Sequence, residues 1–389
     1  MLRDNNIFED NSMYQLYDLA SIHNDGFRTE AKARINKIID ENSFIEGEYN
    51  QSFEKEFAQM QDAKFCRLVA NGTDAIEIAL KAYDIEAGDL VGIPGITFYA
   101  TAEAVYNVGA IPVLIDVEKD TGVMCPESLK RVSEQYDLKA IIAVHIYGIA
   151  CKMDQISHIC RSKDIKIIED SAQASGTITP MGPAGANPYS LSTFSFYPTK
   201  NLSAMGDAGA ILCSDYELAK KIEVLRNHGR GGYATIGRNS RCDHFQAAIL
   251  HLKLQNIDEL NAKRKQNAKL YFQNINNPLI KLLPKECVET SSWHLFPMQL
   301  KDKATASNLV SFLREKGIGS SDIYYAKSMG MEPALDGVKG EREVADSLAG
   351  RVVCIPITPF LTSDDIKLIS TAVNNFQRQE LKNETRPQL

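Results

Sequence analysis

Short apolar runs alternate with helix-length segments through the first half of the chain, and this order constrains the fold more than any other feature. The apolar runs have strand length and stand at Cys66–Ala70, Leu90–Ile93, Pro112–Ile115, Ala140–Ile146 and Ile165–Ile168. The longer segments between them stand at Thr73–Tyr83, Ala100–Asn107, Pro126–Tyr136 and Met153–Lys163. Such alternation indicates βαβ units, whose strands form a mostly parallel sheet covered by helices on both faces.

Two further strands are expected at Thr193–Phe196 and Gly209–Cys213, which makes seven. Only twelve residues separate these two, too few for a helical crossover, so at least one antiparallel pairing is expected. A length of 389 residues favours two domains of ~150 residues or more. The predicted fold class is α/β, with a large domain over residues 1–250 and a smaller C-terminal α+β domain over residues 251–389. A long helical tract around 243–272 is expected to join them.

The flanking regions have simpler patterns. Residues 1–50 are expected to form a helical lead-in, and Gln51–Gln61 has the apolar spacing of an amphipathic helix. In the C-terminal part, strands are predicted at Trp293–Leu300 and Val352–Ile357, and helices at Thr305–Lys316 and Ser363–Gln377. The polar tail from Lys382 to Leu389 is expected to fray.

Composition excludes several classes of protein. The net charge is −7 with scattered Lys and Arg, so no nucleic-acid footprint is present. The N-terminus has no apolar segment resembling a signal peptide. The longest uncharged apolar run, Ala140–Cys151, is far shorter than the ~20 residues of a membrane helix. Eight dispersed cysteines lack CxxC pairs and metal-ligand spacing, which favours a cytoplasmic protein with reduced thiols and no metal site.

One candidate site residue is Lys200, in the stretch Ser-Phe-Tyr-Pro-Thr-Lys-Asn-Leu that starts at Ser195. Pro198 ends the preceding strand because it has no N–H for the ladder. Lys200 therefore lies on a turn at the end of a buried strand. Burial there would lower the pKa of its amine and make it a nucleophile toward an aldehyde. The alternative is an ordinary surface lysine.

Ligands of a parallel α/β sheet bind beyond the carboxyl ends of its strands, and a phosphate site is expected at one such end. Gly72 lets a ligand approach the backbone at the start of a helix, where N–H groups are free and the Thr73 hydroxyl adds a donor. The Ser195 hydroxyl could meet the same phosphate. The alternative for this turn is a helix N-cap formed by Thr73 or Asp74.

A second strand end, Ile167-Ile168-Glu169-Asp170, places two carboxylates next to each other. A buried carboxylate needs a cationic partner or strong hydrogen bonds, and a protonated pyridine nitrogen is one such partner. The alternative is an N-cap for the following helix. Together with Lys200, the phosphate turn and an aromatic ring at Phe98, this carboxylate completes the set of groups that pyridoxal 5′-phosphate (PLP) requires.

The chain resembles the DegT/StrS-type family of PLP-dependent nucleotide-sugar aminotransferases over nearly its whole length. The family's motifs occur in order, and the segments around Asp170 and Lys200 are the most specific. They begin at Asn71 (NGTDA), Pro94 (PGITFYAT), Val144 (VHIYG), Glu169 (EDSAQA), Ser195 (SFYPTKNL), Arg226 (RNHG) and Asn239 (NSR).

The resemblance implies a fold-type I PLP aminotransferase that forms a homodimer with active sites at the subunit boundary. It assigns catalysis to Lys200, which forms the Schiff base with PLP, and to Asp170, which pairs with the pyridine nitrogen. It also assigns the contacts with the cofactor. One of them is Asn239, which would reach the phosphate of the neighbouring subunit's cofactor. The remaining contacts are Gln173 at the ring hydroxyl side, Phe98 on the ring face, and Gly72, Thr73 and Ser195 at the phosphate.

Three positions depart from the family's pattern. Ser175 stands where the family usually has histidine, and Ser203 replaces the glycine that usually follows Lys-Asn-Leu. Ser171 changes the usual Glu-Asp-Ala-Ala to Glu-Asp-Ser-Ala. None of the three removes an expected cofactor contact.

The implied activity is amination of a nucleotide-linked 3-keto or 4-keto deoxysugar, with glutamate as amino donor, in the biosynthesis of polysaccharide or natural-product sugars. Three alternatives stay open: a sugar dehydratase, an amino-acid aminotransferase of the same fold type, and a non-catalytic PLP-binding regulator. Relatives that remove a sugar hydroxyl have histidine where Lys200 stands, which argues against the first. His294, Tyr324 and the 228–238 loop are candidate substrate contacts, each equally compatible with a structural role.

Overall fold

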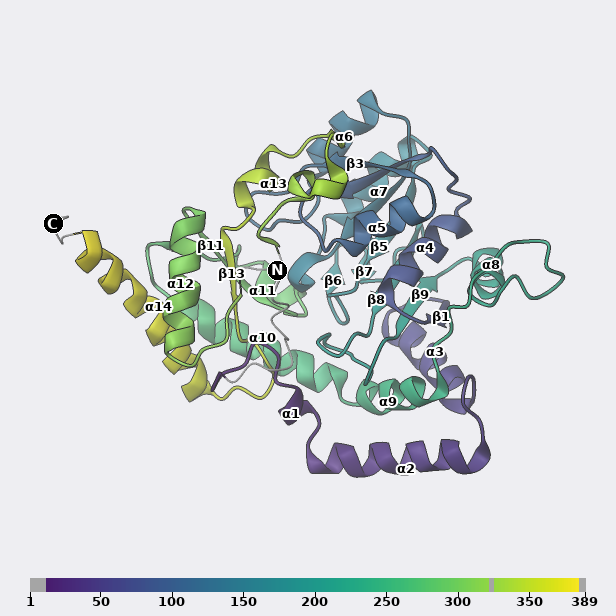
Figure 1. Ribbon diagram of the computed structural model, residues 1–389, viewed down its shortest axis with the longest axis horizontal. Helices are drawn as coiled ribbons and strands as arrows, with labels where there is room; N and C mark the ends of the chain where they lie inside the picture. Colours follow the sequence, from purple (N-terminus) through teal and green to yellow (C-terminus); the bar gives the residue numbers. More distant parts are fainter. Residues whose placement is uncertain (1–11, 322–324, 385–389) are drawn as a thin grey trace.

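A large sheet of eight strands organises the molecule (Figure 1). The computed structural model describes residues 12–321 and 325–384. All seven expected strands of this sheet are present, and an eighth, β12, comes from the C-terminal part. In spatial order the strands are β1 (Phe65–Val69), β9 (Gly209–Cys213), β8 (Ser190–Ser195), β5 (Lys166–Asp170), β4 (Leu138–Val144), β2 (Leu90–Pro94), β3 (Ile111–Ile115) and β12 (Lys339–Gly340).

The sheet is mostly parallel, as predicted. Only β9 is antiparallel to its neighbours, and it lies between β8 and β1. The expected antiparallel pairing is therefore the one between the two strands that flank the stretch containing Lys200. Helices cover both faces of parallel strands and exclude water from them, which explains why their sequences are nearly continuous apolar runs.

Helices cover both faces of the sheet. Those whose bounds follow the predicted alternation are α4 (Gly72–Ala82), α5 (Ala100–Asn107), α6 (Pro126–Gln135), α7 (Met153–Ser162) and α8 (Tyr216–Arg226). The N-terminal part supplies α1 (Leu19–Ile22), α2 (Asp25–Glu41) and α3 (Glu48–Met60), and α2 packs along α9 at the lower edge of Figure 1. The expected tract at 243–272 is two helices, α9 (His244–Leu254) and α10 (Ile257–Asn274).

A smaller sheet of three antiparallel strands stands beside the large one, on the left of Figure 1. Its strands are β10 (Ile280–Lys281), β11 (Phe296–Leu300) and β13 (Val352–Ile355), with α12 (Lys303–Glu315) and α14 (Ser363–Glu384) packed nearby. Both predicted C-terminal strands and both helices are thus found. The short elements are α11 (Cys287–Thr290), α13 (Glu343–Leu348), the hairpin β6 (Ile178–Thr179) and β7 (Gly182–Pro183), and the 3-10 turns η1 (Ile146–Gly148), η3 (Met329–Met331) and η4 (Pro333–Leu335). Of the tail expected to fray, Lys382–Leu389, residues 382–384 belong to helix α14, and the rest lie outside the described residues.

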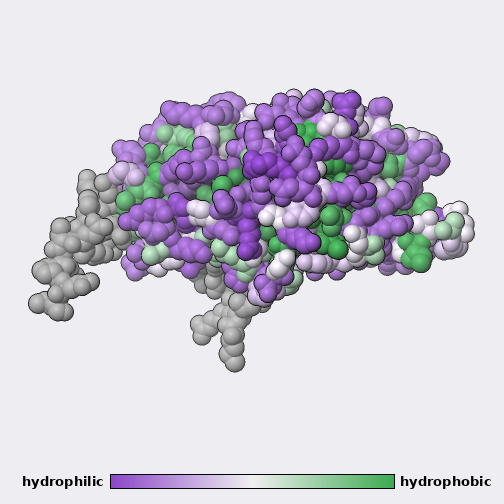
Figure 2. Space-filling view, turned by 90° about the horizontal axis from the view of Figure 1, so that it is seen from above, coloured by the Kyte–Doolittle hydropathy of each residue, from purple (hydrophilic) through white to green (hydrophobic). Residues whose placement is uncertain are grey.

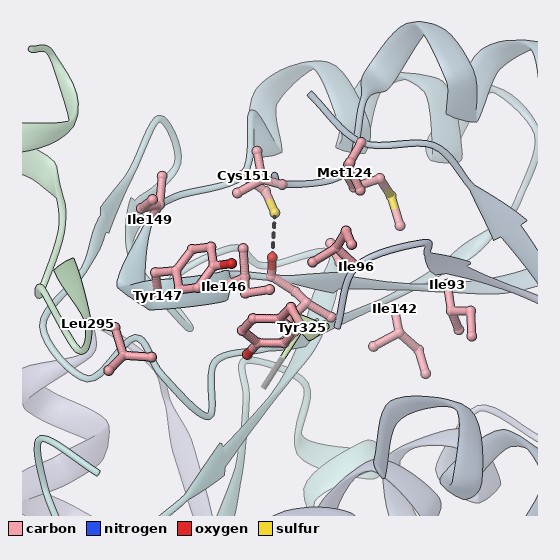
Figure 3. Close-up of a cluster of buried hydrophobic side chains, with 14 of the residues drawn as sticks. Ile93, Ile96, Met124, Ile142, Ile146, Tyr147, Ile149, Cys151, Leu295 and Tyr325 are labelled. Atoms are coloured by element: carbon pink, nitrogen blue, oxygen red, sulfur yellow. Dashed lines mark hydrogen bonds between the residues drawn. The ribbon is translucent and has the colours of Figure 1, made fainter. Parts of the chain in front are cut away.

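The hydrophobic core is continuous from the large sheet into the C-terminal part. Figure 3 shows Leu295 and Tyr325, both from the C-terminal part, beside buried residues that follow β4, and a hydrogen bond in this region joins the Cys151 Sγ to the Val144 carbonyl. A second cluster packs α3 and α9 against β8. There the rings of Phe194 and Phe196 meet those of Phe53 and Phe57 at centroid distances of 5.0–5.4 Å. This packing confirms the alternation expected in β8 and directs Ser195 to the other face.

The surface is predominantly hydrophilic, with hydrophobic side chains in separate groups, as Figure 2 shows for one face. No helix among the described residues combines the length and apolarity needed to cross a membrane.

Candidate active site

A cavity of about 810 Å³ opens beyond the carboxyl ends of the parallel strands. It is bounded by the residues that follow β1, β2, β5 and β8 and by side chains from the N-terminal and C-terminal parts. Seven of the eight predicted site residues line this cavity: Gly72, Thr73, Phe98, Asp170, Gln173, Ser195 and Lys200. The carboxyl ends of parallel strands are where an α/β sheet binds its ligands.

Lys200 lies on a turn between the neighbouring strands β8 and β9. The turn, residues 197–203, is closed by a hydrogen bond of 2.8 Å from the Lys200 N–H to the Tyr197 carbonyl. Desolvation lowers the pKa of the Lys200 amine to about 8, although the nearby Asp170 carboxylate opposes the shift. The uncharged form of this amine, which is the nucleophile, is therefore far more abundant near neutral pH than it is for an exposed lysine.

Asp170 is the last residue of β5 and is only 7% exposed. Its carboxylate accepts hydrogen bonds from the Ala172 N–H at 3.1 Å and from the Thr101 hydroxyl at 3.2 Å. Desolvation raises the pKa of Asp170, while these two hydrogen bonds and the Lys200 charge lower it by less. The carboxylate thus remains short of positive charge, so a cation placed in the cavity would stabilise its ionised form.

The neighbouring carboxylate, Glu169, points away from the cavity. Its two oxygens meet the His145 Nε2 at 3.0 Å and the Ser190 hydroxyl at 2.5 Å, and its side chain is fully buried. The Cys151 N–H donates to the Nδ1 of His145, so the imidazole carries its proton on Nε2 and donates it to Glu169. Of the two carboxylates in the motif, only Asp170 is available to a ligand.

Gly72 begins helix α4 and lies against Ser195. A Cβ atom at Gly72 would come within 2.8 Å of the Ser195 Cβ, so any larger residue would separate the helix from β8. The N-cap is Asn71, whose side chain accepts from the Asp74 N–H at 2.8 Å. The alternative of a cap by Thr73 or Asp74 is therefore wrong, and Thr73 stands in the first turn with its side chain at the cavity wall.

Both polar atoms of the Gln173 side-chain amide form hydrogen bonds. Its Oε1 accepts from the Tyr147 N–H at 2.5 Å, and its Nε2 donates to the Tyr325 hydroxyl at 2.9 Å. Tyr147 adopts a positive φ of 61°, which turns its N–H toward Gln173. On another wall, Phe98 is 57% exposed and presents its ring to open space.

Asn239 is the one predicted site residue that does not line the cavity. It is exposed, and its side-chain oxygen accepts hydrogen bonds from Arg241 at 2.8 and 3.1 Å. The residue before it, Arg238, does line the cavity and pairs with Asp74 and Glu77 on α4. Successive residues of this extended segment thus face opposite directions.

Among the candidate substrate contacts, His294 and Arg238 of the 228–238 loop line the cavity. Desolvation, with the charges of Lys200 and Arg264, lowers the pKa of His294, so its imidazole is neutral. Tyr324 lies outside the described residues, whereas its neighbour Tyr325 lines the cavity. Of the three positions that depart from the family's pattern, Ser175 is buried and is absent from the cavity wall.

Sequence reasoning missed several residues of the site, among them Thr101, Tyr17 and Tyr325. Thr101 donates to Asp170, and its hydroxyl lies 2.8 Å from that of Thr97. The quoted motif PGITFYAT contains both threonines, so the signal was present. Tyr17 also lines the cavity, but its segment carried no recognisable pattern.

One group of side chains away from the cavity has the spacing of metal ligands. Among the described residues, Glu118, Cys125 and Glu127 bring potential ligand atoms within 4.8 Å of one another. None of the three lines the cavity, and Glu118 already pairs with Lys152 at 2.9 Å.

An amine and a carboxylate that face one cavity at this edge of a mostly parallel sheet are the arrangement of a PLP-dependent aminotransferase. The model of the DegT/DnrJ/EryC1/StrS aminotransferase family matches residues 26–374, and the chain belongs to that family. The fold agrees with this assignment.

Relatives and solved structures resemble the chain over nearly its full length. The dTDP-3-amino-3,6-dideoxy-α-D-galactopyranose transaminase of Aneurinibacillus thermoaerophilus is 34% identical, over 94% of this chain and 99% of the relative. The UDP-N-acetyl-3-dehydro-α-D-glucosamine 3-aminotransferase of Acidithiobacillus ferrooxidans is 32% identical, over 93% and 98%. The structure of S. venezuelae DesV in complex with a ketimine intermediate has a TM-score of 0.87 at 30% identity, covering 94% of this chain and 98% of that one.

Proposed function

We propose that this PLP-dependent aminotransferase converts a nucleotide-linked 3-keto deoxysugar to the 3-amino sugar, with glutamate as the amino donor. The observation that carries the proposal is the pairing of Lys200 and Asp170 across one large cavity. The names of both relatives described above place the nitrogen or the keto group at position 3. A relative from Bacillus subtilis that is 28% identical over 89% of this chain and 80% of its own length is named 3-oxo-glucose-6-phosphate:glutamate aminotransferase.

The residues fit PLP on two observations. Gly72 lies so close to Ser195 that no Cβ fits between them, which brings the Ser195 hydroxyl to the first turn of α4, where a phosphate could meet free N–H groups. The Asp170 carboxylate is buried without a full complement of positive charge, which suits a protonated ring nitrogen. Asp170 would therefore hold the ring nitrogen. The other cofactor contacts would be Gly72, Thr73 and Ser195 at the phosphate, Phe98 at the ring face and Gln173 at the ring hydroxyl.

PLP supplies an aldehyde that takes up the amino group and a ring that withdraws electrons from the reacting carbon. Lys200 would hold the cofactor through its Nζ, whose uncharged form is the nucleophile, and would be free to act on protons once an amino donor has taken its place. The freed Nζ then accepts the proton from the donor's α carbon and, in the second half of the reaction, delivers a proton to the sugar carbon that gains nitrogen. A protonated ring nitrogen beside Asp170 would keep its carboxylate ionised, and Thr101 and the Ala172 N–H hold its two oxygens in place.

The size and polarity of the cavity support a large polar substrate. Its volume of about 810 Å³ lies in the upper part of the usual range of ~300–1,000 Å³ for ligand sites. Lys200 and Arg238 are the two cationic side chains among its described lining residues. Arg238 offsets the carboxylates of Asp74 and Glu77, so an anionic substrate would meet less repulsion at this wall.

We propose a homodimer in which Asn239 reaches the cofactor phosphate of the neighbouring subunit. The support is the exposure of Asn239 together with apolar side chains near the cavity. Phe98, Tyr99 and Met205 are 57%, 38% and 44% exposed, and a second subunit would cover such groups. We also propose the cytoplasm as location, since all eight cysteines are free thiols.

The test uses purified enzyme loaded with PLP. Glutamate should convert the bound cofactor to pyridoxamine phosphate, and nucleotide-linked 3-keto sugars should then gain nitrogen, measured as product mass. Nucleotide-linked 4-keto sugars serve as the matched comparison, and Lys200→Ala serves as the inactive control. Equal or faster turnover of the 4-keto series would contradict the assignment of position 3. Failure of glutamate to convert PLP would favour the regulatory alternative.

A further inference from the structure

Lys253 is a buried amine that the mechanism above does not use. It lies on α9 and is only 8% exposed. Its Nζ lies 2.9 Å from the Ser203 hydroxyl and 3.0 Å from the His23 Nε2. Among the described residues, its Nζ forms no ion pair with a carboxylate, and desolvation lowers the pKa of this amine to about 7. Keeping an amine here costs stability, so a benefit other than stability is expected.

The first of these contacts fixes the turn that carries Lys200. Ser203 is buried at the end of that turn, three residues after Lys200. Its hydroxyl gives this turn a side-chain bond to α9 that a glycine could not make. The same turn is held on its other side by Asn201, whose Nδ2 donates to the Ser292 carbonyl at 2.8 Å.

The second contact fixes the N-terminal segment. His23 follows α1, and burial together with the charge of Lys253 lowers its pKa to about 4. The imidazole is therefore neutral, and its Nε2 accepts a hydrogen bond from the Lys253 Nζ. The Lys253 Nζ also lies 5.4 Å from the Phe27 ring centroid. Six residues before His23, Tyr17 lines the active-site cavity, with its ring 6.0 Å from that of His294.

We propose that Lys253 is a positioning residue that ties the Lys200 turn to the N-terminal segment, so that one buried amine sets the places of both Lys200 and Tyr17. The inference rests on the proposed role of Lys200. Through Ser203 it limits where the Lys200 amine can lie, and through His23 it holds Tyr17 at the opposite wall. Small displacements of reacting groups lower the reaction rate strongly, so a bond from Lys253 that fixes the Lys200 turn would support catalysis.

The test compares Lys253→Met and Ser203→Ala with a matched control, Lys263→Met. Lys263 lies on the adjacent helix α10, where it is half exposed and pairs with Glu259 at 2.7 Å. Ser203→Thr keeps the hydroxyl and serves as the conservative variant. Each variant is examined by thermal unfolding, by hydrogen exchange of the cofactor-free protein, and by labelling of Lys200 with pyridoxal and borohydride mapped by mass. The single-turnover rate with glutamate is measured on the loaded enzyme.

Lys253→Met is expected to unfold at the same or a higher temperature than the wild type, yet to lose about tenfold in the single-turnover rate with little change in glutamate affinity. Hydrogen exchange should quicken in residues 12–23 and in residues 197–206. Ser203→Ala should quicken exchange only in residues 197–206, with the same loss of rate and a changed rate of Lys200 labelling. Ser203→Thr and Lys263→Met should behave as the wild type.

Wild-type labelling and turnover in both Lys253→Met and Ser203→Ala would overturn the proposal. The proposal would also fail if Lys253→Met lost rate together with a lower unfolding temperature while Ser203→Ala kept the wild-type rate and the wild-type labelling of Lys200. If Lys253→Met does not fold, the Ser203 variants decide the question alone. If the wild type does not transaminate, the proposed function fails, whereas exchange and Lys200 labelling still decide whether Lys253 positions the turn.

Discussion

Burial acts in opposite directions on the two groups that face each other in the cavity. It lowers the pKa of Lys200 to about 8 and raises the pKa of Asp170, and the attraction between the two charges offsets only part of each shift. Both shifts follow from the loss of water around a charge. The pair is thus prepared for a ligand that is positively charged beside the carboxylate and reactive toward an uncharged amine.

The charge of Asp170, rather than its shape, should be what catalysis needs. Asp170→Asn keeps the size of the side chain and its hydrogen-bonding oxygen, so we expect the variant to fold and to bind PLP. Turnover should fall by about a hundredfold or more, because the buried negative charge is gone. Absorbance titration with PLP and a glutamate assay check these two expectations separately. A turnover rate near that of the wild type would remove Asp170 from the mechanism.

The buried amine of Lys253 should make the free energy of unfolding increase with pH above about 7. Its pKa is lowered from 10.5 to about 7 in the folded state. Below about 7 both states bind the proton, whereas between about 7 and 10.5 only the unfolded state does. The unfolded state thus binds more protons in this window, and the free energy of unfolding rises with pH there.

Lys253→Met should remove this contribution and flatten the rise of unfolding free energy above pH ~7. Urea denaturation of the cofactor-free protein at a series of pH values measures the slope. Lys263→Met should retain the wild-type slope. An unchanged slope in Lys253→Met would show that the amine is not buried as described.

At the scale of elements, the close fit of α4 against β8 should control the affinity for phosphate. Gly72→Ala places a Cβ 2.8 Å from that of Ser195, so the start of α4 must move away from β8. We expect PLP affinity to fall at least about tenfold, since a well-placed set of charge-assisted hydrogen bonds would be disturbed. Competition with inorganic phosphate, followed by absorbance, measures the change.

The matched control is Gly26→Ala. Gly26 lies in α2, where a Cβ would meet nothing closer than the Asn24 Oδ1 at 3.4 Å. Alanine there should leave PLP affinity unchanged, since its Cβ would make no strained contact. Equal PLP affinity in the two variants would contradict a phosphate site at the start of α4.

Sequence patterns predicted the elements of the large sheet well because buried parallel strands are nearly continuous apolar runs. They could not predict β12, since Lys339 and Gly340 carry no apolar signal and pair with β3 only through their backbone. They also missed the break between α9 and α10 at Gln255 and Asn256, because the helical periodicity on the two sides is similar.

The candidate site was predictable where a motif coincided with a strand end. Lys200, Asp170 and Gly72 all follow this rule and meet in one cavity. Tyr17 and Lys253 do not, because their roles depend on contacts between segments far apart in the sequence. Lys253 and Ser203 are fifty positions apart, and neither carries a local pattern.

At the scale of the whole molecule, the proposed sharing of active sites can be tested by mixing two inactive variants. A dimer of one Lys200→Ala subunit and one Asn239→Ala subunit has one site with both defects and one site with neither. Random reassociation of equal amounts makes half of the dimers mixed, so about a quarter of all sites should be intact. The measurement is turnover before and after unfolding and refolding the mixture.

Recovery in the refolded mixture, beyond the sum of the separate variants, is the expected result. Each variant refolded alone is the control for losses in handling. If activity only averages the two variants, Asn239 does not act across the subunit boundary. A single-subunit mass in light scattering would contradict the dimer itself.

The antiparallel strand β9 has a consequence for how such an enzyme could change its range of substrates. Because β8 and β9 are hydrogen-bonded neighbours that both have a strand on their other side, the chain leaves and re-enters the framework close to the reactive amine. Loops at the rim, such as the glycine-rich one after α8, can therefore be lengthened, shortened or exchanged while the amine keeps its place. Transplanting rim loops between relatives is accordingly a route to new sugars that leaves the chemistry undisturbed.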